Sequence, residues 1–330
     1  MNWKNKKVLV CGGAGMIGSS LSRELLKRGA NITIADDLSS GSIKNIRDIR
    51  KGVDFQKVDL RVAELCSRIT KDKDAVFQYA ARMGGIGFIT THLADIMYDN
   101  ALINLNVLEA SRRNEVPLYF FSSSACVYPN YKQTEVNVVP LKESDVMPAD
   151  PNEPYGFEKL FSELLCASYQ HDYGMNIRIA RFHNIYGAVY TAFDKEKGKA
   201  PCHIIMKAIK HPNPPFTLWG KGDATRSYCY IDDCTEMVLR LVESDCPHPI
   251  NVGSDRLISV DDLATLVIKI SGKSIIPLHD LSMPEGVKGR NADLTLCEEV
   301  LKWRPQISLE DGMKRTYLWA VEHYDELENI

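Results

Sequence analysis

The fold of this chain is decided by the stretch Lys7-Val8-Leu9-Val10-Cys11-Gly12-Gly13-Ala14-Gly15-Met16-Ile17-Gly18. An apolar run typical of a buried strand leads into glycines at positions 12, 15 and 18. A helical pattern follows from Met16 to Lys27, and a second apolar run at residues 32–35 ends at Asp36. This order of strand, glycine turn, helix, strand and acid is typical of a βαβ unit that binds a dinucleotide.

The spacing of these residues predicts how the dinucleotide is held. The three glycines allow a tight turn and a close approach of the backbone to a pyrophosphate. The helix that begins near Met16 and Ile17 directs free N–H groups and the positive end of its dipole at the phosphates. The carboxylate of Asp36 can accept a hydrogen bond from a ribose 2′-hydroxyl and would repel a 2′-phosphate, so we expect NAD rather than NADP.

The rest of the first half keeps alternating β-prone and helical segments, which predicts a Rossmann-type, doubly wound parallel sheet of the α/β class. The expected strands are residues 8–11, 32–35, 53–58, 75–79, 118–122 and 177–181. The expected helices are residues 16–27, 62–68, 92–113 and 154–173. Ligands bind beyond the carboxyl ends of such strands, and there we expect Asp59, Leu60, Ala80 and Phe182 to contact the cofactor.

The pattern changes after Gly187, which indicates a second domain. Residues 188–200 are irregular and charged, a helix is expected at residues 201–210, and a proline-rich break follows. We expect residues 1–185 to form the cofactor-binding domain, with segments near residues 227–255 returning to it. Residues 186–330 would form a smaller α/β domain that binds the substrate.

The composition excludes several classes of protein. The chain of 330 residues has a formal net charge of −3 and no long basic run, so nucleic acid is not expected as a partner. No apolar run approaches the roughly 18 residues of a membrane span, and no signal-peptide pattern is seen, so we expect a cytoplasmic protein without a membrane partner. The nine cysteines follow no CxxC or metal-ligand spacing, which predicts free thiols and no metal site.

Tyr155 and Lys159 are candidates for catalysis. Four positions apart on a helix, they share one face. A phenol has a pKa near 10, so Tyr155 needs a shift of about 3 units, or about 4 kcal/mol, to act as a base at neutral pH. A neighbouring lysine and a cationic nicotinamide ring both favour the phenolate, and the hydroxyl of Ser124, at the end of a predicted strand, can share a substrate oxygen with Tyr155.

The glycine turn, the serine cluster Ser122-Ser123-Ser124 and the YxxxK pair, in this order, resemble the extended short-chain dehydrogenase/reductase family. The family's nucleotide-sugar branch is similar in three further stretches: Arg181-Phe182-His183-Asn184-Ile185-Tyr186-Gly187, Arg226-Ser227-Tyr228-Cys229-Tyr230-Ile231-Asp232-Asp233 and Asn251-Val252-Gly253. Within this branch the chain resembles the GDP-mannose 3,5-epimerases at residues 80–88, 123–129, 181–187 and 284–291. The resemblance covers essentially the whole chain.

The resemblance implies an NAD-dependent epimerase that acts on a GDP-sugar. Tyr155 would take the proton of the C4 hydroxyl while a hydride leaves C4, and the ketone so formed would acidify the C–H bonds at C3 and C5. The resemblance assigns the base and the acid that invert these centres to Cys126 and Lys199. Both groups must be tuned toward neutrality from ordinary pKa values of about 8.5 and about 10.4.

The resemblance also implies binding roles. Lys159 would contact the nicotinamide ribose and Asp59 the adenine. A homodimer is expected, with residues 92–113 and Pro154–Tyr173 in contact. Two arginines suit a diphosphate because each guanidinium can bond two phosphate oxygens, whereas Lys207 is read equally well as a surface residue. The residues implied to hold the nucleotide sugar are Gly84, Ser124, Ala125, Cys126, Asn184, Lys199, Lys207, Arg226 and Arg290.

One residue leaves the reaction open. The GDP-fucose synthases of the same branch pair this cysteine with a histidine, and His203 stands near that position, so Lys199 and His203 are both candidates for the acid. A GDP-fucose-synthase-like 3,5-epimerase/4-reductase is therefore the alternative, together with an epimerase of another GDP-hexose or heptose. Asp36 favours NAD, whereas a net reduction normally uses NADPH, so Asp36 argues against this alternative. A non-catalytic NAD-binding protein is a third hypothesis, against which stand Tyr155 and Lys159.

Overall fold

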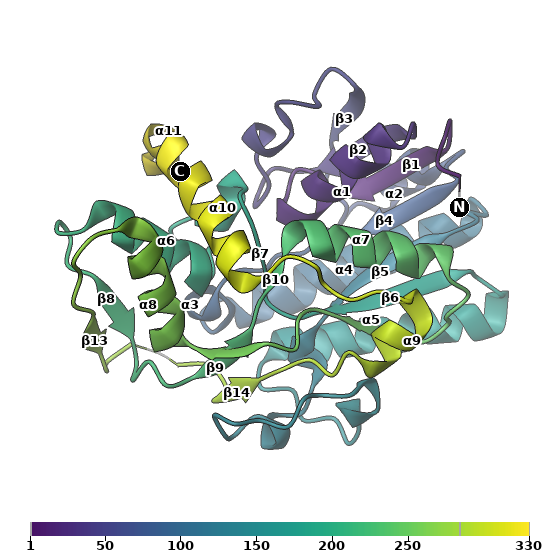
Figure 1. Ribbon diagram of the computed structural model, residues 1–330. Coiled ribbons are helices and arrows are strands. Elements are labelled where there is room, and N and C mark those ends of the chain that lie inside the picture. The colour runs from purple at the N-terminus through teal and green to yellow at the C-terminus, as the bar shows by residue number, and fades with distance from the viewer. Residues whose placement is uncertain (1, 284, 330) are drawn as a thin grey trace.

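The computed structural model describes residues 2–283 and 285–329, so Pro284 of the 284–291 stretch lies outside the described residues (Figure 1). Seven parallel strands form the main sheet, in the order β11-β6-β5-β4-β1-β2-β3. In chain order they are β1 (Lys7–Cys11), β2 (Asn31–Asp36), β3 (Val53–Lys57), β4 (Ala75–Gln78), β5 (Tyr119–Ser124), β6 (Ile177–Phe182) and β11 (Ile250–Val252).

This strand order confirms the predicted doubly wound sheet. The chain adds β2 and β3 on one side of β1 and then crosses to add β4, β5 and β6 on the other, so the winding direction reverses at β1. The ends of the six predicted strands differ from those in the structure by at most two residues. The seventh strand, β11, is only three residues long and comes from the second half of the chain.

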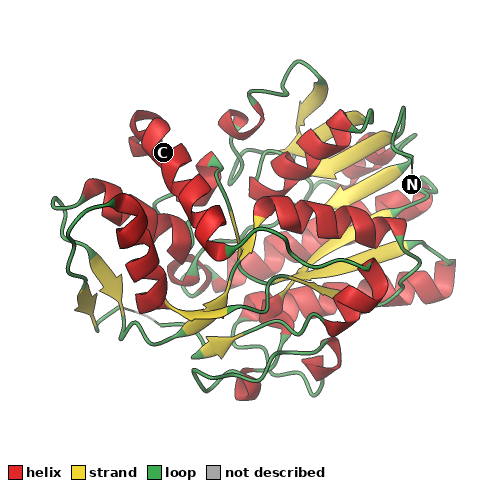
Figure 2. Ribbon diagram, in the orientation of Figure 1, coloured by secondary structure: helices red, strands yellow, loops and turns green. Residues whose placement is uncertain are grey.

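Helices cover both faces of the sheet (Figure 2). Both faces of the sheet are apolar and need cover. In β1, Val8 and Val10 pack into one apolar core, and Leu9 and Cys11 pack into the core on the other face. On one face α2 packs against α4 and α4 against α5, and on the other α1 packs against α7. The helices of this part are α1 (Met16–Lys27), α2 (Ala63–Thr70), α3 (Ile86–Ile89), α4 (Leu93–Arg113), α5 (Pro154–Tyr173) and α7 (Ile231–Glu243).

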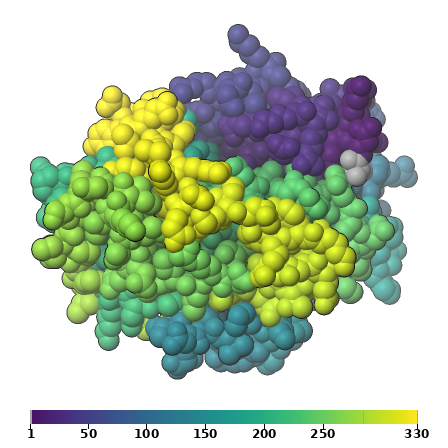
Figure 3. All heavy atoms as spheres, in the orientation of Figure 1, coloured from purple at the N-terminus to yellow at the C-terminus, as the bar shows by residue number. Residues whose placement is uncertain are grey.

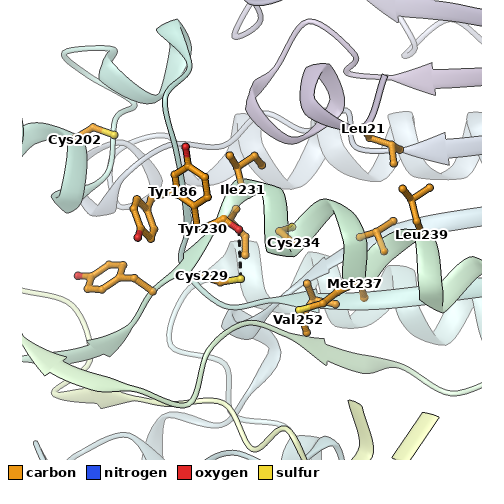
Figure 4. Packing of buried hydrophobic residues seen from close by; sticks show 14 of the residues in the cluster. Leu21, Tyr186, Cys202, Cys229, Tyr230, Ile231, Cys234, Met237, Leu239 and Val252 are labelled. Carbon is orange, nitrogen blue, oxygen red and sulfur yellow. Dashed lines mark hydrogen bonds between the residues drawn. The ribbon is translucent and has the colours of Figure 1, made fainter. Parts of the chain in front are cut away.

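Figure 4 shows how the second half of the chain is joined to the sheet. Leu21 of α1, Met237 and Leu239 of α7 and Val252 of β11 belong to one buried apolar cluster. The same cluster includes Cys202 of α6 (Ala200–Lys210). The two parts of the molecule therefore share a continuous core, which fixes the position of the cavities between them.

The second half contributes small sheets and further helices. Their strands pair as β10 with β7, β12 with β9 and β14, and β13 with β8. Residues of the C-terminal helices lie across the surface between the N-terminal and the central parts of the chain (Figure 3). The remaining elements are β7 (Ile185–Tyr186), β8 (Thr217–Trp219), β9 (Thr225–Ser227), β10 (Cys229–Tyr230), β12 (Leu257–Ser259), β13 (Leu278–Asp280), β14 (Gly289–Arg290), α8 (Val260–Ser271), α9 (Thr295–Leu301), α10 (Leu309–Glu322) and α11 (Tyr324–Glu328).

Further sequence expectations concern α6, the segment before it and the cysteines. The predicted helix at residues 201–210 is found as α6, and the irregular segment before it contains one short 3₁₀ helix, Tyr190–Phe193. All nine cysteines are free. Within the described part of the chain, no helix combines the length and the apolar character that crossing a membrane requires.

Candidate active site

A cavity of about 600 Å³ lies beyond the carboxyl ends of β1, β2, β4 and β5. It brings together all the residues for which the sequence predicts cofactor contact. Helix α1 begins there, so its first N–H groups point at the cavity. The predicted cofactor residues in its lining are Gly12, Gly15, Met16, Ile17, Gly18, Asp36, Asp59, Leu60, Ala80, Tyr155, Lys159 and Phe182.

The glycine turn has no room for side chains at two positions. Gly12 has a φ of +71°, and a Cβ there would lie 2.7 Å from the backbone nitrogen of Ala80. A Cβ on Gly18 would overlap the carbonyl oxygen of Gly12. The backbone at the end of β1 therefore forms a bare cradle beside the start of a helix, which fits the diphosphate of a dinucleotide.

Asp36 is fixed by the backbone at the end of β2. The N–H of Ala14 donates to its Oδ2 and the N–H of Leu38 to its Oδ1, both at 2.9 Å. Burial raises the pKa of Asp36 above its usual range, although both donors oppose that rise. A Cβ on Gly41 would lie 2.6 Å from Oδ1, so the loop after β2 passes directly over this carboxylate. Such a site fits a ribose hydroxyl, and a phosphate there would meet like charge.

The far end of the cavity holds charges that are already paired. Arg61 donates to the carboxylates of Asp59 and Asp99, at 2.8 and 3.0 Å. Arg82 pairs with the other oxygen of Asp99 at 2.9 Å. The bonds from Arg61 hold the pKa of Asp59 below its usual range. Both arginines are thus neutralised, which again favours a cofactor without a 2′-phosphate.

A second cavity, of about 330 Å³, adjoins the first. Ser124, Tyr155 and Lys199 line both cavities and so stand where the two meet. His203 lines only the second cavity. The structure also brings all the predicted substrate residues into the lining of this second cavity, namely Gly84, Ser124, Ala125, Cys126, Asn184, Lys199, Lys207, Arg226 and Arg290.

Helix α5 carries Tyr155 into the junction. A Cβ on Gly156 would overlap the carbonyl oxygen of Cys126, so this glycine lets the helix press against the segment that follows β5. The hydroxyl of Ser124 accepts the N–H of Cys126 at 3.1 Å, which fixes the start of the same segment. Lys159, one turn along the helix, donates to the carbonyl of Ser122 at 3.1 Å. Tyr155 and Lys159 therefore share one buried face, as predicted from their spacing.

The expected electrostatic help from Lys159 to Tyr155 is not found in the protein alone. Burial raises the pKa of Tyr155 well above its ordinary value, and only the hydrogen bond from Ser124 opposes this. The ammonium nitrogen of Lys159 lies 5.8 Å from the centre of the Tyr155 ring, and burial lowers its own pKa. Desolvation of the phenol therefore dominates in the protein alone, and the predicted combined effect of Lys159 and a nicotinamide ring stays a prediction. A phenolate would need further positive charge beside the ring.

Cys126 is the most activated thiol of the chain. Burial alone would raise its pKa, but Arg290, Ser124 and Lys199 together bring the pKa below its ordinary value. The Nη1 of Arg290 donates to the Sγ at 3.4 Å. By contrast, burial raises the pKa of buried cysteines such as Cys202 and Cys234. A half-buried thiol with a lowered pKa in a cavity is a better candidate for a base than an ordinary cysteine.

Lys199 and His203 stand in different surroundings. Lys199 precedes α6, and burial and Arg290 lower its pKa while the Cys126 thiolate opposes that fall. The Nε2 of His203 lies 3.0 Å from the carbonyl oxygen of Asp194, and because a carbonyl only accepts, this nitrogen carries the proton. One ring nitrogen of His203 is therefore already engaged in holding the backbone of the preceding turn.

The other predicted substrate residues are held mainly by backbone oxygens. Arg226 donates to the carbonyls of Thr225 and Val287, both at 2.7 Å, and burial together with Arg290 lowers its pKa to about 10. Lys207 donates to the carbonyl of Thr217, and burial lowers its pKa. Asn184, with a φ of +45°, donates to the carbonyl of Ser227 at 3.0 Å.

Sequence reasoning missed several residues of the two cavities. Trp219 and Tyr228 line the second cavity, and Ser39, Ser40 and Lys197 line the first. The polar turn that follows Asp36 in the sequence was an available signal for the two serines. Gln133, whose side-chain oxygen accepts the Nε of Arg290 at 2.6 Å, had no local signal because 157 positions separate the two residues.

The fold and the two cavities define a class of protein. The first cavity lies at the glycine turn of a Rossmann sheet, and the second is lined by several cations. A serine, a tyrosine and a lysine line both cavities, as in enzymes that use a nicotinamide dinucleotide. The chain belongs to the NAD dependent epimerase/dehydratase family, because the model of that family matches residues 8–253. This match confirms the family predicted from the sequence motifs, and the chain is an enzyme of the NAD-dependent epimerase type.

Individual proteins agree with this assignment. A GDP-mannose 3,5-epimerase of Arabidopsis thaliana is 42% identical over 322 residues, which cover 98% of this chain and 84% of that protein. A GDP-L-fucose synthase of Sinorhizobium fredii is 31% identical and covers 94% of each chain. The solved structure of a Thermus thermophilus UDP-glucose 4-epimerase in complex with NAD has a TM-score of 0.81 at 25% identity, and it covers 95% of this chain and 98% of that one.

Proposed function

We propose that this enzyme is an NAD-dependent epimerase of a GDP-sugar and that its substrate is GDP-mannose, inverted at C3 and C5. The observation that carries the proposal is the thiol of Cys126, which accepts a hydrogen bond from Arg290 and lines the second cavity together with Lys199, whose charge lowers the pKa of the thiol. Simple 4-epimerisation or dehydration would not require such a thiol. The Arabidopsis thaliana GDP-mannose 3,5-epimerase, at 42% identity, supports this choice of substrate.

The first step concerns the C4 position. NAD, when bound, would accept a hydride from C4 and later return it. The protein's part is proton transfer, for which Tyr155 stands at the junction of the two cavities with Ser124 beside it. Lys159, on the same helix face, would orient the cofactor's ribose. The ketone formed at C4 makes the hydrogens at C3 and C5 acidic enough for side-chain bases.

Inversion needs a base and an acid of suitable strength. The lowered pKa of Cys126 makes the thiolate easier to form than that of an ordinary cysteine, and the thiolate is the form that would remove a proton from carbon. Lys199, whose pKa is lowered by burial, can then supply a proton to the opposite face. Arg226, Arg290 and Lys207 give the cavity the positive charge that a GDP diphosphate requires.

Proton NMR of GDP-mannose with the enzyme in D₂O tests the proposal. We expect deuterium to replace hydrogen at C3 and C5 without added cofactor, because the hydride returns in each cycle. A Cys126→Ser variant should keep C4 oxidation but lose most exchange. The matched control is Cys246→Ser, since that free thiol lines neither cavity. Absence of exchange at both carbons in the wild type would exclude this reaction.

A GDP-fucose-synthase-like 3,5-epimerase/4-reductase is the second candidate. It is favoured by the presence of His203 in the substrate cavity and by the Sinorhizobium fredii relative. The hydrogen bond from His203 to Asp194 and the paired arginines Arg61 and Arg82 in the first cavity weigh against it. This reaction would consume reduced cofactor stoichiometrically with a 4-keto-6-deoxy sugar, so an unchanged nicotinamide absorbance rules it out. An epimerase of another GDP-hexose or heptose would be identified by NMR of products from a panel of GDP-sugars.

We further propose that the enzyme is a homodimer through α4 and α5. These helices pack side by side, and each leaves large apolar side chains exposed. Phe157, Phe161 and Leu164 recur at helical spacing on α5, and Tyr98 and Leu105 are exposed on α4. A stripe of this kind on two adjacent helices is typical of a surface buried by another subunit.

A further inference from the structure

The turn of residues 194–199, which connects the first half of the chain to α6, is rigidly built. The Oδ1 of Asp194 accepts the N–H groups of Glu196 and Lys197, at 2.9 and 2.7 Å. The carbonyl of Asp194 accepts the N–H of Gly198 at 2.9 Å and the ring of His203 at 3.0 Å. A Cβ on Gly198 would lie 2.5 Å from the Nε2 of that histidine, so the turn and the ring are closely packed. The side chains it projects are therefore held in defined places.

Lys197 reaches from this turn across the cofactor cavity. Its Nζ donates to the carbonyl of Ser39 at 2.7 Å and to the hydroxyl of Ser40 at 3.2 Å, both in the loop after β2. The same ammonium lies 5.5 Å from the centre of the Phe88 ring. Lys197, Ser39, Ser40, Gly12 and Gly15 all line this one cavity.

Lys197 differs from the arginines of that cavity in its partners. Arg61 and Arg82 are each paired with two carboxylates. Among the residues that the structure describes, no carboxylate forms an ion pair with Lys197, whose hydrogen-bond partners are neutral oxygens. An ammonium has three donors, so one donor and the full charge remain for an anion.

We propose that Lys197 is a cofactor-binding residue that takes the diphosphate of the dinucleotide from the side opposite the glycine turn. This inference rests on the proposed use of NAD. The glycine turn and the N-terminus of α1 would supply backbone N–H groups, and Lys197 a side-chain cation without a carboxylate partner in the described part of the chain. The cofactor would then bind both halves of the chain, and the turn that ends at Lys199 would be fixed by the cofactor as well as by His203.

The alternative role of Lys197 is a contact with the adenosine ribose. Equilibrium dialysis of the full-length protein against NAD, ADP and adenosine separates the two, because only the first two ligands carry a diphosphate. We expect Lys197→Gln to weaken NAD and ADP about tenfold, the loss of roughly one charge-assisted hydrogen bond, and to leave adenosine unchanged. Lys197→Arg keeps the charge and should retain most of the affinity, which distinguishes a lost contact from a misfolded turn.

Lys195→Gln is the matched control, since Lys195 lies in the same turn but donates to the carbonyl of Glu328 at 2.8 Å. Equal losses for adenosine, equal losses in this control, or unchanged NAD binding in Lys197→Gln would each overturn the inference while leaving the proposed function intact. Failure of the wild type to bind NAD at all would refute the proposed function and this inference with it.

Discussion

Replacing Arg290 by glutamine should raise the pKa of the Cys126 thiol. Arg290 is the strongest of the groups that stabilise the thiolate against burial, and its Nη1 donates to the sulfur at 3.4 Å. The pKa of Cys126 is depressed, so the thiolate persists to lower pH than that of an ordinary thiol and is lost as the pH falls through that pKa. Without the guanidinium charge this loss occurs at higher pH, and less thiolate remains at neutrality.

The size of the effect follows from the distance. Two unit charges 3.4 Å apart interact by about 1 kcal/mol at a dielectric constant of 80 and by about 5 kcal/mol at 20. Cys126 is half-buried, so its effective dielectric constant lies between these values. Since one pKa unit is about 1.4 kcal/mol, these limits correspond to rises of about one unit and about 3.5 units, and we expect the pKa of Cys126 to rise within this range.

The assay is the rate of alkylation of Cys126 by iodoacetamide as a function of pH, read by peptide mass spectrometry so that the other eight cysteines do not interfere. It requires neither substrate nor turnover. Lys207→Gln is the control, because it removes a positive charge from the same cavity at a residue that contacts Thr217 rather than the thiol. An unchanged pKa in Arg290→Gln, or an equal rise in the control, would refute the reasoning.

Four further variants test separate parts of the structure. Lys199→Met should abolish deuterium exchange at C3 or C5 while C4 oxidation persists, seen as nicotinamide absorbance; full exchange would remove Lys199 from the mechanism. Gly12→Ala should cost about 1–2 kcal/mol of stability from its φ of +71° and abolish NAD retention, measured by thermal melting and cofactor content. Gly156→Ala should fold but lose nearly all turnover, because the methyl group would displace the carbonyl of Cys126; wild-type rates would contradict this. Phe161→Glu should yield monomers in analytical ultracentrifugation, and a persistent dimer would place the interface elsewhere.

The sheet could be predicted from the sequence because each of its signals is local. The glycine turn, the acid at Asp36 and the apolar runs all act through neighbours along the chain, and the six strands and four helices expected in the first half are found in the structure. The face shared by Tyr155 and Lys159 likewise follows from helical spacing alone. Strand β11 lies in the range that was expected to return to the first domain, but it was not predicted as a strand because a three-residue segment has too little pattern to be recognised.

The electrostatics of the site could not be predicted, because they depend on burial and on contacts between distant segments. The bond from Arg290 to Cys126 joins residues 164 positions apart. Burial, which is the largest influence on the pKa of Tyr155, comes from the packing of several segments and has no local signal in the sequence. Only the folded chain shows that one nitrogen of His203 is engaged by Asp194 while Lys199 faces both cavities.

Several cations line the second cavity, although both their burial and their mutual repulsion disfavour the charged forms. Burial and the nearby Arg290 both lower the pKa of Arg226 and of Lys199, which means that their protonated forms are held at an energetic cost. A diphosphate would relieve this repulsion, so binding energy from a part of the substrate that does not react can order the groups around the sugar. Two of these cations, Arg290 and Lys199, also lower the pKa of Cys126. In the proposed reaction, one set of charges would therefore both attract the nucleotide and stabilise the thiolate, and these residues come from separate segments of the chain.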